Sequence, residues 1–380
     1  MKEQFLQLIW KQKLFNHSNL KLSNGKSLLL KNYGTFNSHE SGPDFFNARL
    51  SIDGLVWSGN IEIHIKSSDW YKHNHQFDPA YNNVILHVVW ENDCSVEING
   101  WEIPVLELKD RVEPKLLMNL TQFQKSIANF PCQNLIGSID PIYLSQMMDS
   151  SLMLRLERKT SSIPEMDVKQ LAYLLFAKAI GGKVNQFAFE YLAQNLPFSF
   201  LEHLSYPQRK LTIASHNGLQ LSRGYKESGL DIKYKRKGMR PSSFPEKRLK
   251  QLGNLIPLIS DFLSFVELPP EELVFNFRKQ VQKLDNTISF DAQNLLLINA
   301  VVPLLFIHGK FAEFNYLQEK AIDILQLLPP EKNNCVTKMR SIGFKVNNSF
   351  DSQAILEIYN EFCSNKKCMQ CSVGFKILQK

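Results

Sequence analysis

The stretch that decides the fold is GPDFFNARLSIDGLVWSGNIEIHIKSSDW, which runs from Gly42 to Trp70. Apolar and polar residues alternate over 48–52, and Asp53-Gly54 then supplies the pair typical of a tight hairpin turn. Alternation resumes over 60–66, where isoleucine occupies every second position. Because successive side chains of a strand point to opposite faces, the residues between the isoleucines share the other face. The stretch therefore predicts a β-hairpin whose second strand carries a polar row of Glu62, His64 and Lys66.

The flanking sequence extends this hairpin into an α+β domain. The N-terminal segment MKEQFLQLIWKQKLF has the apolar spacing of an amphipathic helix. Strands are predicted over 27–36 and 83–90, a second hairpin over 96–108, and a polar loop or short helix over 68–82. We expect these elements to form a domain of residues 1–112 around a mixed β-sheet.

The remaining chain, residues 113–380, is predicted to form a larger, mainly α-helical domain. Apolar residues recur there at helical spacing over 140–159, 167–180, 185–196, 245–265, 270–284, 291–307, 315–328 and 352–363. The most apolar run, LLLINAVVPLLFI over 295–307, is shorter than the roughly 18 residues of a membrane span. It also contains Asn299 and Pro303, so we expect a buried helix and no membrane contact.

The composition is that of a globular protein, with 44% hydrophobic and 21% charged residues among 380. The formal net charge of +7 permits a polyanionic partner but does not require one. The N-terminal segment lacks the uninterrupted apolar core of a signal peptide, so we expect a cytoplasmic protein. The chain has no Walker A string, no glycine-rich dinucleotide fingerprint and no Gly-x-Ser-x-Gly, which argues against those enzyme classes.

Two carboxylates flank the hairpin, Asp44 before its first strand and Glu62 on its second. Carboxylate oxygens are the ligands that Mg²⁺ and Mn²⁺ prefer, and metal-dependent phosphodiester hydrolysis also needs a group that orients water. We expect Asp44 and Glu62 to hold Mg²⁺ or Mn²⁺, and His64 or Lys66 to orient the water or to stabilise the developing charge. The alternative is that the polar row simply faces solvent.

The sequence Pro43-Asp44, a spacer and Glu62-x-His64 resembles the motif of the PD-(D/E)XK nuclease superfamily. The resemblance implies a restriction-endonuclease-like core over about residues 1–110, namely a helix, three antiparallel strands, a helix and a further strand. The chain departs from the superfamily at the lysine of Glu-x-Lys, because His64 takes that position and Lys66 follows two residues later.

The register of the hairpin decides whether the two carboxylates meet. A two-residue turn at Asp53-Gly54 would place Glu62 opposite Phe45 and would point Asp44 to the other face. A three-residue turn, or a β-bulge near Gly59 or in 43–46, would bring the two carboxylates to one face. The sequence leaves these alternatives open.

Three histidines follow the hairpin, His73 and His75 in the polar segment and His87 in the next strand. As functional residues, His73 and His75 would flank the site and contact the phosphates of a nucleic acid; otherwise they belong to a solvated loop. His87 lies between apolar residues, which is typical of a hydrogen-bonded core histidine. If the three rings converge, a metalloenzyme built on histidines becomes the better interpretation.

A strongly basic segment lies over 233–250, KYKRKGMRPSSFPEKRLK, and it includes two aromatic residues. Basic and aromatic side chains together suit the backbone and the bases of a nucleic acid. We expect Arg240 and Arg248 to contact the phosphates of DNA or RNA. The alternative is a solvated loop that leads into a helix.

Three cysteines near the C-terminus are closely spaced, as Cys363-x4-Cys368-x2-Cys371. Thiolates at such spacing can hold Zn²⁺ or an iron–sulfur cluster when a fourth ligand is present. Cys132 is the expected fourth ligand and Cys335 the reserve; free thiols are the alternative. One upstream and three C-terminal cysteines also resemble the iron–sulfur staple of some helicase-associated and CRISPR-associated nucleases of the same superfamily, although the spacing differs.

Several longer strings resemble an uncharacterised bacterial family known only as a domain of unknown function. They include GPDFFNARL, WSGNIEIH, YNNVILHVV, RPSSFP and CMQCSVG, and they extend over nearly the full chain. The resemblance implies a bacterial, cytoplasmic protein and no established activity.

Together these observations favour a metal-dependent nuclease acting on DNA or RNA, with Asp44, Glu62, His64 and Lys66 as its catalytic residues. The alternative is a catalytically inactive nucleic-acid-binding or scaffold protein with a structural metal or cysteine cluster. Replacement of the lysine of Glu-x-Lys is what a decayed enzyme would show.

Overall fold

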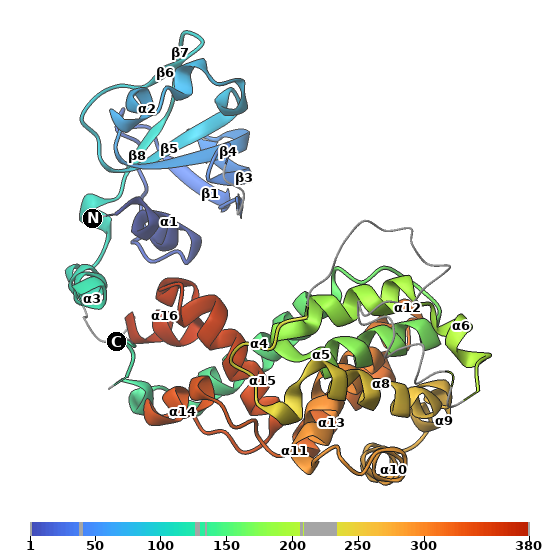
Figure 1. Cartoon of the computed structure of the whole chain (residues 1–380). Coiled ribbons are helices and arrows are strands. Elements are labelled where there is room, and N and C mark those ends of the chain that lie inside the picture. Colours follow the sequence, from blue (N-terminus) through green and yellow to red (C-terminus); the bar gives the residue numbers. More distant parts are fainter. Residues whose placement is uncertain are drawn as a thin grey trace. The chain divides into compact units, whose positions relative to one another are not determined.

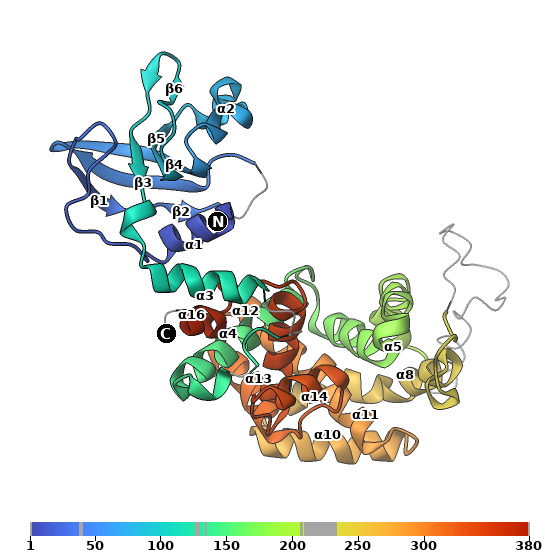
Figure 2. The same ribbon diagram turned by 90° about the vertical axis from the view of Figure 1, so that its left-hand side faces the viewer.

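The computed structural model describes residues 2–37, 41–125, 130–133, 135–205, 208 and 234–378. The chain forms two compact units, Met1–Pro131 with Gly374–Lys380, and Cys132–Val373. Figures 1 and 2 show that the strands are gathered in the N-terminal part and that helices make up most of the rest. The predicted fold class, α+β with a mixed sheet followed by a mainly helical region, is confirmed.

The first unit is built on a mixed six-stranded sheet. Its strands are β1 (Leu28–Asn32), β2 (Thr35–Phe36), β3 (Phe45–Ile52), β4 (Leu55–Lys66), β5 (Val84–Glu91) and β8 (Val105–Glu107). Their order is β1-β3-β4-β5-β8, with β2 paired to β3. The β1–β3 and β3–β4 pairs are antiparallel, whereas the β4–β5 and β5–β8 pairs are parallel. Parallel neighbours need a crossover, and the one from β4 to β5 contains α2 (Asp69–Lys72), η1 (His75–Phe77) and η2 (Pro79–Tyr81).

A β-bulge in β3 sets the register of the hairpin. The two-residue turn at Asp53-Gly54 holds its register only as far as Ala48, which pairs with Gly59. Beyond that point Phe45 pairs with Ile61, so that two residues of β3 lie opposite one residue of β4. The extra residue moves every preceding side chain to the opposite face. Of the alternatives that the sequence leaves open, the bulge is the one present.

Helix α1 (Glu3–Lys11) is the amphipathic helix predicted at the N-terminus. It packs against β4 and buries five apolar side chains, Phe5, Leu6, Leu8, Ile9 and Trp10. Helix α3 (Pro114–Lys125) follows the sheet. A second apolar cluster under the crossover contains Trp70, Tyr81, Val84, Val96, Ile98 and Ile103. The crossover that carries the histidines is therefore anchored on both sides by buried aromatic residues.

The second predicted hairpin is confirmed only at its turn. β6 (Glu97–Ile98) pairs with β7 (Trp101–Glu102), but the rest of the predicted hairpin leaves it and joins the main sheet as β8, parallel to β5. Pro104 lies at the break and has no N–H to continue the hairpin ladder. Its carbonyl instead accepts a hydrogen bond from the N–H of His87, at 2.9 Å.

The second unit is helical throughout the residues that the structure describes. Its longer helices are α4 (Pro141–Thr160), α5 (Val168–Asn195), α8 (Pro245–Ser260), α10 (Pro270–Leu284), α12 (Val302–Phe311), α13 (Asn315–Leu327), α14 (Asn334–Ser341) and α15 (Ser349–Glu357). Shorter elements are η4 (Ile136–Ser138), α6 (Phe198–Glu202), η5 (Pro241–Ser243), α9 (Leu263–Val266), α11 (Phe290–Leu296), the π-helices η6 (Leu297–Val301) and η7 (Ile358–Cys363), and η8 (Cys368–Gln370). Helix α16 (Ser372–Leu378) ends the described chain, and from Gly374 onward it belongs to the first unit.

Two features of this unit were predicted from sequence. Helix α5 is interrupted at Gly182, whose φ of +59° breaks it between the two segments predicted over 167–180 and 185–196. The apolar run 295–307 is a buried helix, as expected. The continuous segment Phe290–Phe311 is long and apolar enough to cross a membrane, but 72% of its most apolar window is buried inside the unit, as in a core helix.

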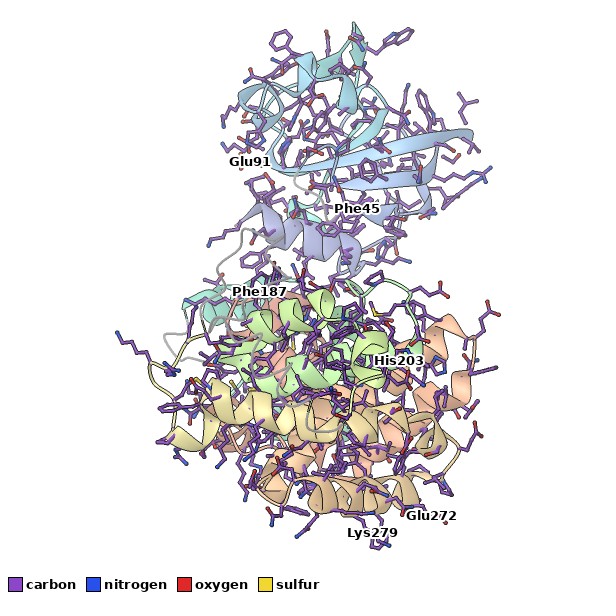
Figure 3. The ribbon with its side chains drawn as sticks, turned by 45° about the vertical axis from the view of Figure 1, so that its right-hand side comes forward. Phe45, Glu91, Phe187, His203, Glu272 and Lys279 are labelled. Atoms are coloured by element: carbon purple, nitrogen blue, oxygen red, sulfur yellow. The ribbon has the colours of Figure 1, made fainter. Side chains whose placement is uncertain are left out.

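Helix α10 separates charged and apolar side chains between two faces, although Phe275 is exposed. Figure 3 shows Glu272 and Lys279 on α10, both exposed, while Leu273, Val274 and Phe277 of the same helix are buried. This division is typical of a helix that packs by one stripe.

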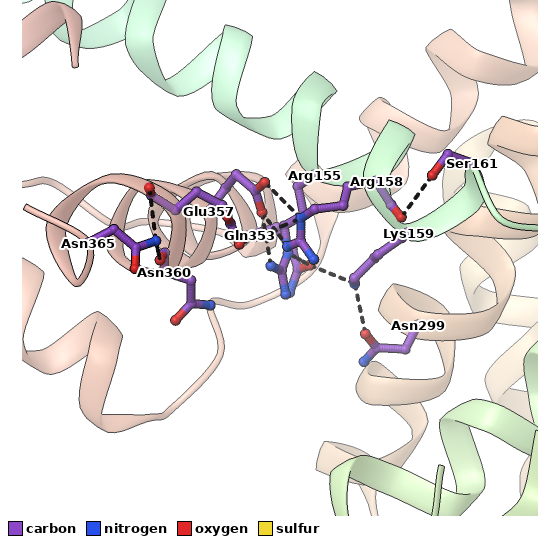
Figure 4. Close-up of polar contacts among 10 residues, drawn as sticks. Arg155, Arg158, Lys159, Ser161, Asn299, Gln353, Glu357, Asn360 and Asn365 are labelled. Carbon is purple, nitrogen blue, oxygen red and sulfur yellow. Dashed lines mark hydrogen bonds and ion pairs between the residues drawn. The ribbon is translucent and has the colours of Figure 1, made fainter. Parts of the chain in front are cut away.

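A buried polar cluster joins α4 to α15 (Figure 4). Glu357 accepts hydrogen bonds from Arg155 and Arg158, the shortest at 2.6 Å from Arg158 Nη2. Lys159 Nζ donates to Asn299 Oδ1 and Gln353 Oε1, both at 3.0 Å. Burial, followed by the positive charge of Arg155, lowers the pKa of Lys159 to about 7.

Candidate metal centre

The candidate site lies in the first unit, where the sheet, the crossover and α1 meet. β4 contributes Glu62 and His64, and β5 contributes His87. The crossover contributes His73 and His75, and Asp44 immediately precedes β3. The pairing of β4 with β5 places Glu62 directly beside His87.

The two carboxylates meet because of the bulge. Glu62 Oε2 accepts a hydrogen bond from the Asp44 N–H at 3.1 Å, and Asp44 Oδ2 accepts one from the Ile63 N–H at 3.0 Å. Burial, and then the neighbouring Glu62 carboxylate, raise the pKa of Asp44; burial also raises the pKa of Glu62. Two buried acids this close resist ionising together unless a positive charge lies beside them.

Glycine at 59 is needed for the close approach of β5. A Cβ atom added there would lie 2.5 Å from the carbonyl oxygen of Asn83, which accepts a hydrogen bond from the Asn60 N–H at 2.8 Å. The register of the β4–β5 pair also shifts between Asn60 and Ile61. Gly59 therefore helps to set the strand that presents Glu62 and His64.

The histidines form a chain through His64. His64 Nδ1 lies 2.9 Å from His87 Nε2, and His64 Nε2 lies 3.1 Å from His73 Nδ1. Burial, followed by His87, lowers the pKa of His64 to about 2, and burial lowers the pKa of His87 to about 3. The rings of His64 and His87 are therefore neutral at physiological pH, which is the form in which a histidine binds a metal ion.

The second oxygen of Glu62 faces the histidines. Glu62 Oε1 lies 3.5 Å from His64 Nε2 and 3.4 Å from His75 Nε2. The ring of His75 is held by Tyr81, stacked at a centroid distance of 3.9 Å, and by the edge of Trp70 at 5.4 Å. Glu62 thus connects the carboxylate pair to the histidine group.

The string His73-Asn74-His75 turns both of its rings toward His64. Asn74 has φ +61°, a left-handed conformation that asparagine tolerates better than most residues. His73 ends α2 and His75 begins η1 on either side of this turn. Among the residues that the structure describes, His64, His73 and His75 form the group whose ligand atoms all lie within 4.8 Å of one another.

Lys66 is not brought into this cluster. Its side chain is 46% exposed, and its Nζ lies 3.9 Å from Asp93 Oδ2. Asp93 in turn accepts hydrogen bonds from Ser67 and Ser68. Of the four predicted catalytic residues, the structure therefore gathers Asp44, Glu62 and His64 and leaves Lys66 aside.

Two residues of α1 belong to the site although sequence reasoning did not select them. Gln7 Nε2 donates to Asp44 Oδ1 at 2.7 Å. Burial raises the pKa of Glu3, which lies within the electrostatic field of His73 and His75. The available signal was their spacing, since two polar residues four positions apart share one face of a helix that is otherwise largely buried.

The predicted nucleic-acid contacts in the second unit lie around the start of α8. Arg240 is exposed and precedes η5. Arg248 is half-buried, and burial lowers its pKa. The rings of Tyr234 and Phe189 pack in a T-shaped arrangement, at a centroid distance of 5.6 Å. Lys233 lies outside the described residues.

The four predicted cysteine ligands all belong to the second unit, but among the described residues they do not form a group whose ligand atoms all lie within 4.8 Å of one another. Burial, followed by the nearby thiols of Cys371 and Cys368, raises the pKa of Cys132 to about 12. Burial raises the pKa of Cys363 as well, again with Cys371 and Cys132 as contributors. No disulfide joins the described cysteines, Cys335 included.

Comparison with known proteins places the chain in a family. A family model described as a protein of unknown function (DUF2851) matches residues 3–215 and 272–334. The matched residues include every residue of the candidate metal centre. The basic segment 233–250 and the C-terminal cysteines lie outside the matched residues. No curated protein and no solved structure matches the chain. Because the match extends over well over half of its length, the chain belongs to the DUF2851 family of proteins of unknown function.

Proposed function

We propose that the chain is a metal-dependent nuclease that hydrolyses phosphodiester bonds in DNA or RNA. The observation that carries the proposal is the bulge in β3, because it brings Asp44 against Glu62. Paired buried carboxylates beside neutral imidazoles are a donor set for a divalent ion. Such an ion can polarise a phosphodiester and lower the pKa of a bound water.

The order of elements supports the proposal. α1, β1, β3, β4, α2 and β5 give a helix, three antiparallel strands, a helix and a parallel strand. This is the order that the resemblance to the PD-(D/E)XK superfamily implies. Pro43-Asp44 comes immediately before the second of these strands and Glu62 lies on the third, which is the order that the motif would require.

The proposed reaction is attack of a water oxygen on phosphorus, with cleavage of the bond from phosphorus to the leaving oxygen. Asp44 and Glu62 would hold the ion, which would activate the attacking water, and an ionised carboxylate of the pair would accept the proton of that water. Solvent returns a proton to the leaving oxygen. Arg240 and Arg248 are proposed to hold phosphates away from the cut.

One observation favours the alternative function, a catalytically inactive nucleic-acid-binding or scaffold protein. The lysine position of the motif holds His64, which is neutral, and the ammonium of Lys66 pairs with Asp93. In the described part of the chain, no lysine or arginine contacts Asp44 or Glu62. No positively charged side chain there therefore replaces the motif lysine, which stabilises the developing negative charge in the superfamily.

The test is cleavage of labelled single- and double-stranded DNA and RNA, with Mg²⁺, Mn²⁺ or Zn²⁺ added to anaerobically purified protein. Glu62→Gln is expected to slow cleavage by at least about 100-fold, because it removes a metal ligand. Glu102→Gln is the matched control, since Glu102 is exposed on the β6–β7 hairpin. Equal cleavage by wild type and Glu62→Gln would place the activity elsewhere. Retained binding without cleavage by wild type would favour the inactive alternative.

We further propose that Cys132, Cys363, Cys368 and Cys371 hold a structural Zn²⁺ ion or iron–sulfur cluster. The support is the electrostatic influence of these thiols on one another, together with the burial that raises the pKa values of Cys132, Cys363 and Cys368. A bound cation would reverse that shift and stabilise the thiolates.

A further inference from the structure

We propose that His64, His73 and His75 form a binding site for a first-row divalent transition metal ion of the Zn²⁺ type, with Glu62 as the adjoining carboxylate. One ring nitrogen from each of the three lies within 4.8 Å of the other two. The inference rests on the proposed function for the role of the ion in catalysis, but the binding of the ion stands on the geometry alone.

The separations of the ligand atoms fit such an ion. Zn²⁺ binds imidazole nitrogen at about 2.0–2.1 Å, so neighbouring ligand atoms of a tetrahedral site lie about 3.3 Å apart. His64 Nε2 lies 3.1 Å from His73 Nδ1, while Glu62 Oε1 lies 3.5 Å from His64 Nε2 and 3.4 Å from His75 Nε2. Little rearrangement is needed around these three contacts.

An unpartnered buried nitrogen points to a missing ligand. His75 is only 9% exposed, and its Nε2, although 3.4 Å from Glu62 Oε1, makes no hydrogen bond in the described chain. A buried polar atom without a partner is costly, and such atoms are uncommon in native structures. Coordination of an ion by His75 Nε2 would remove that cost.

The surroundings hold the ligands in place. His87 Nε2 contacts the second ring nitrogen of His64, and so takes the place of the carboxylate, backbone carbonyl or water that usually orients a metal-bound histidine. Trp70 and Tyr81 fix the ring of His75. His73 is exposed, so an ion can enter from solvent without unfolding of the sheet.

The donor set favours a transition metal over Mg²⁺. Mg²⁺ prefers oxygen ligands and keeps several waters, whereas imidazole nitrogen suits Zn²⁺, Fe²⁺, Ni²⁺ and Cu²⁺. Three imidazoles and one carboxylate would leave the bound ion with one unit of net positive charge. Asp44, on the other side of Glu62, remains available to the reacting groups.

The experiment is a Co²⁺ titration of the metal-free full chain, followed by near-ultraviolet and visible absorption. Co²⁺ bound by cysteines shows sulfur-to-metal charge-transfer bands. One equivalent of bound Co²⁺ per chain that lacks these bands therefore reports binding at the histidine site. His73→Ala is the main variant because His73 is exposed, and His75→Gln is the second. His203→Ala is the matched control, an exposed histidine of the second unit (Figure 3).

Wild type and His203→Ala are expected to bind one such equivalent, and millimolar Mg²⁺ is expected not to displace it. His73→Ala and His75→Gln are expected to lose affinity for it by at least about 100-fold, with unchanged circular dichroism. Unchanged Co²⁺ binding in both variants, or displacement by Mg²⁺, would overturn the inference. Loss of the ion in the variants, with no cleavage by wild type, would leave the inference standing and sink the nuclease proposal. Mg²⁺-supported cleavage by wild type, together with Co²⁺ binding that both variants leave unchanged, would sink the inference and leave the nuclease proposal standing.

Discussion

At the scale of single residues, Glu62 is the residue on which the candidate site depends. Its Oε2 accepts a hydrogen bond from the backbone N–H of Asp44, and its Oε1 faces His64 and His75. One carboxylate therefore borders both the acid pair and the histidine group. Its position follows from the alternating pattern of β4, in which the isoleucines of 60–66 are buried or half-buried against the core.

The sequence was sufficient to select Asp44, Glu62 and His64, because their spacing follows the strand period. It was not sufficient for Lys66, since the same period places Lys66 on the polar face while its long side chain reaches Asp93 at the end of the strand. Glu3 and Gln7 were missed because a helix and a strand far apart in the chain come together only through tertiary packing.

Lys159 provides a residue-scale prediction in the second unit. Its pKa is about 7 in the folded chain, against about 10.4 for an unfolded lysine. Between these values the unfolded chain binds a proton that the folded chain does not, so this group's contribution to stability rises with pH. Lys159→Met removes that dependence, and its stability relative to wild type is expected to be highest near pH 7 and to fall toward pH 10.

The measurement is the melting temperature of wild type and Lys159→Met across this pH range. The lost hydrogen bonds to Asn299 and Gln353 shift the difference by a constant amount, so its slope with pH carries the test. A difference that stays constant from pH 7 to pH 10 would show that Lys159 is charged in the folded chain.

At the scale of elements, the bulge in β3 converts a simple hairpin into a site. The turn at Asp53-Gly54 and the alternating pattern predicted the two strands, and both are present. The bulge could not be located from sequence, because phenylalanine stands at both 45 and 46, so either register turns a large apolar side chain toward the core. The distinguishing feature of the bulge is Asn47, whose backbone is left-handed, with φ +57°. The sequence alone does not show which of its many asparagines adopts that conformation.

Asn47 is therefore expected to matter through its backbone. Asn47→Gly should be tolerated, whereas Asn47→Val should lower the free energy of unfolding by about 1–2 kcal/mol, because a β-branched residue is strained at positive φ. Urea unfolding of both variants measures this. Asn47→Val should also weaken binding of Co²⁺ or nucleic-acid cleavage, since relief of the strain moves Asp44. Equal stability of the Gly and Val variants would mean that the bulge is not held by this conformation.

At the scale of the whole molecule, the cysteines of one candidate metal site come from the two ends of the second unit. Cys132 is the first residue of that unit, and Cys371 lies two residues before its last. A metal ion held by residues so distant in sequence closes a long loop and stabilises the folded state against the unfolded one.

Cys132→Ser is expected to remove one structural metal ion or cluster per chain, and to lower the melting temperature. Metal analysis of anaerobically purified protein measures the first effect and calorimetry the second. Cys335→Ser is the matched control, because Cys335 lies in α14 and is a free thiol. Unchanged metal content in Cys132→Ser, or loss in Cys335→Ser instead, would reject Cys132 as the fourth ligand.

The most direct test of the account is the cleavage rate of labelled DNA and RNA by wild type and Asp44→Asn. Asp44 is the residue that the bulge brings to Glu62, and asparagine keeps its size while removing its charge. The account predicts metal-dependent cleavage by wild type and a loss of at least about 100-fold in Asp44→Asn. Cleavage at the same rate by both proteins, or no cleavage by wild type with any of the three metals, would contradict it.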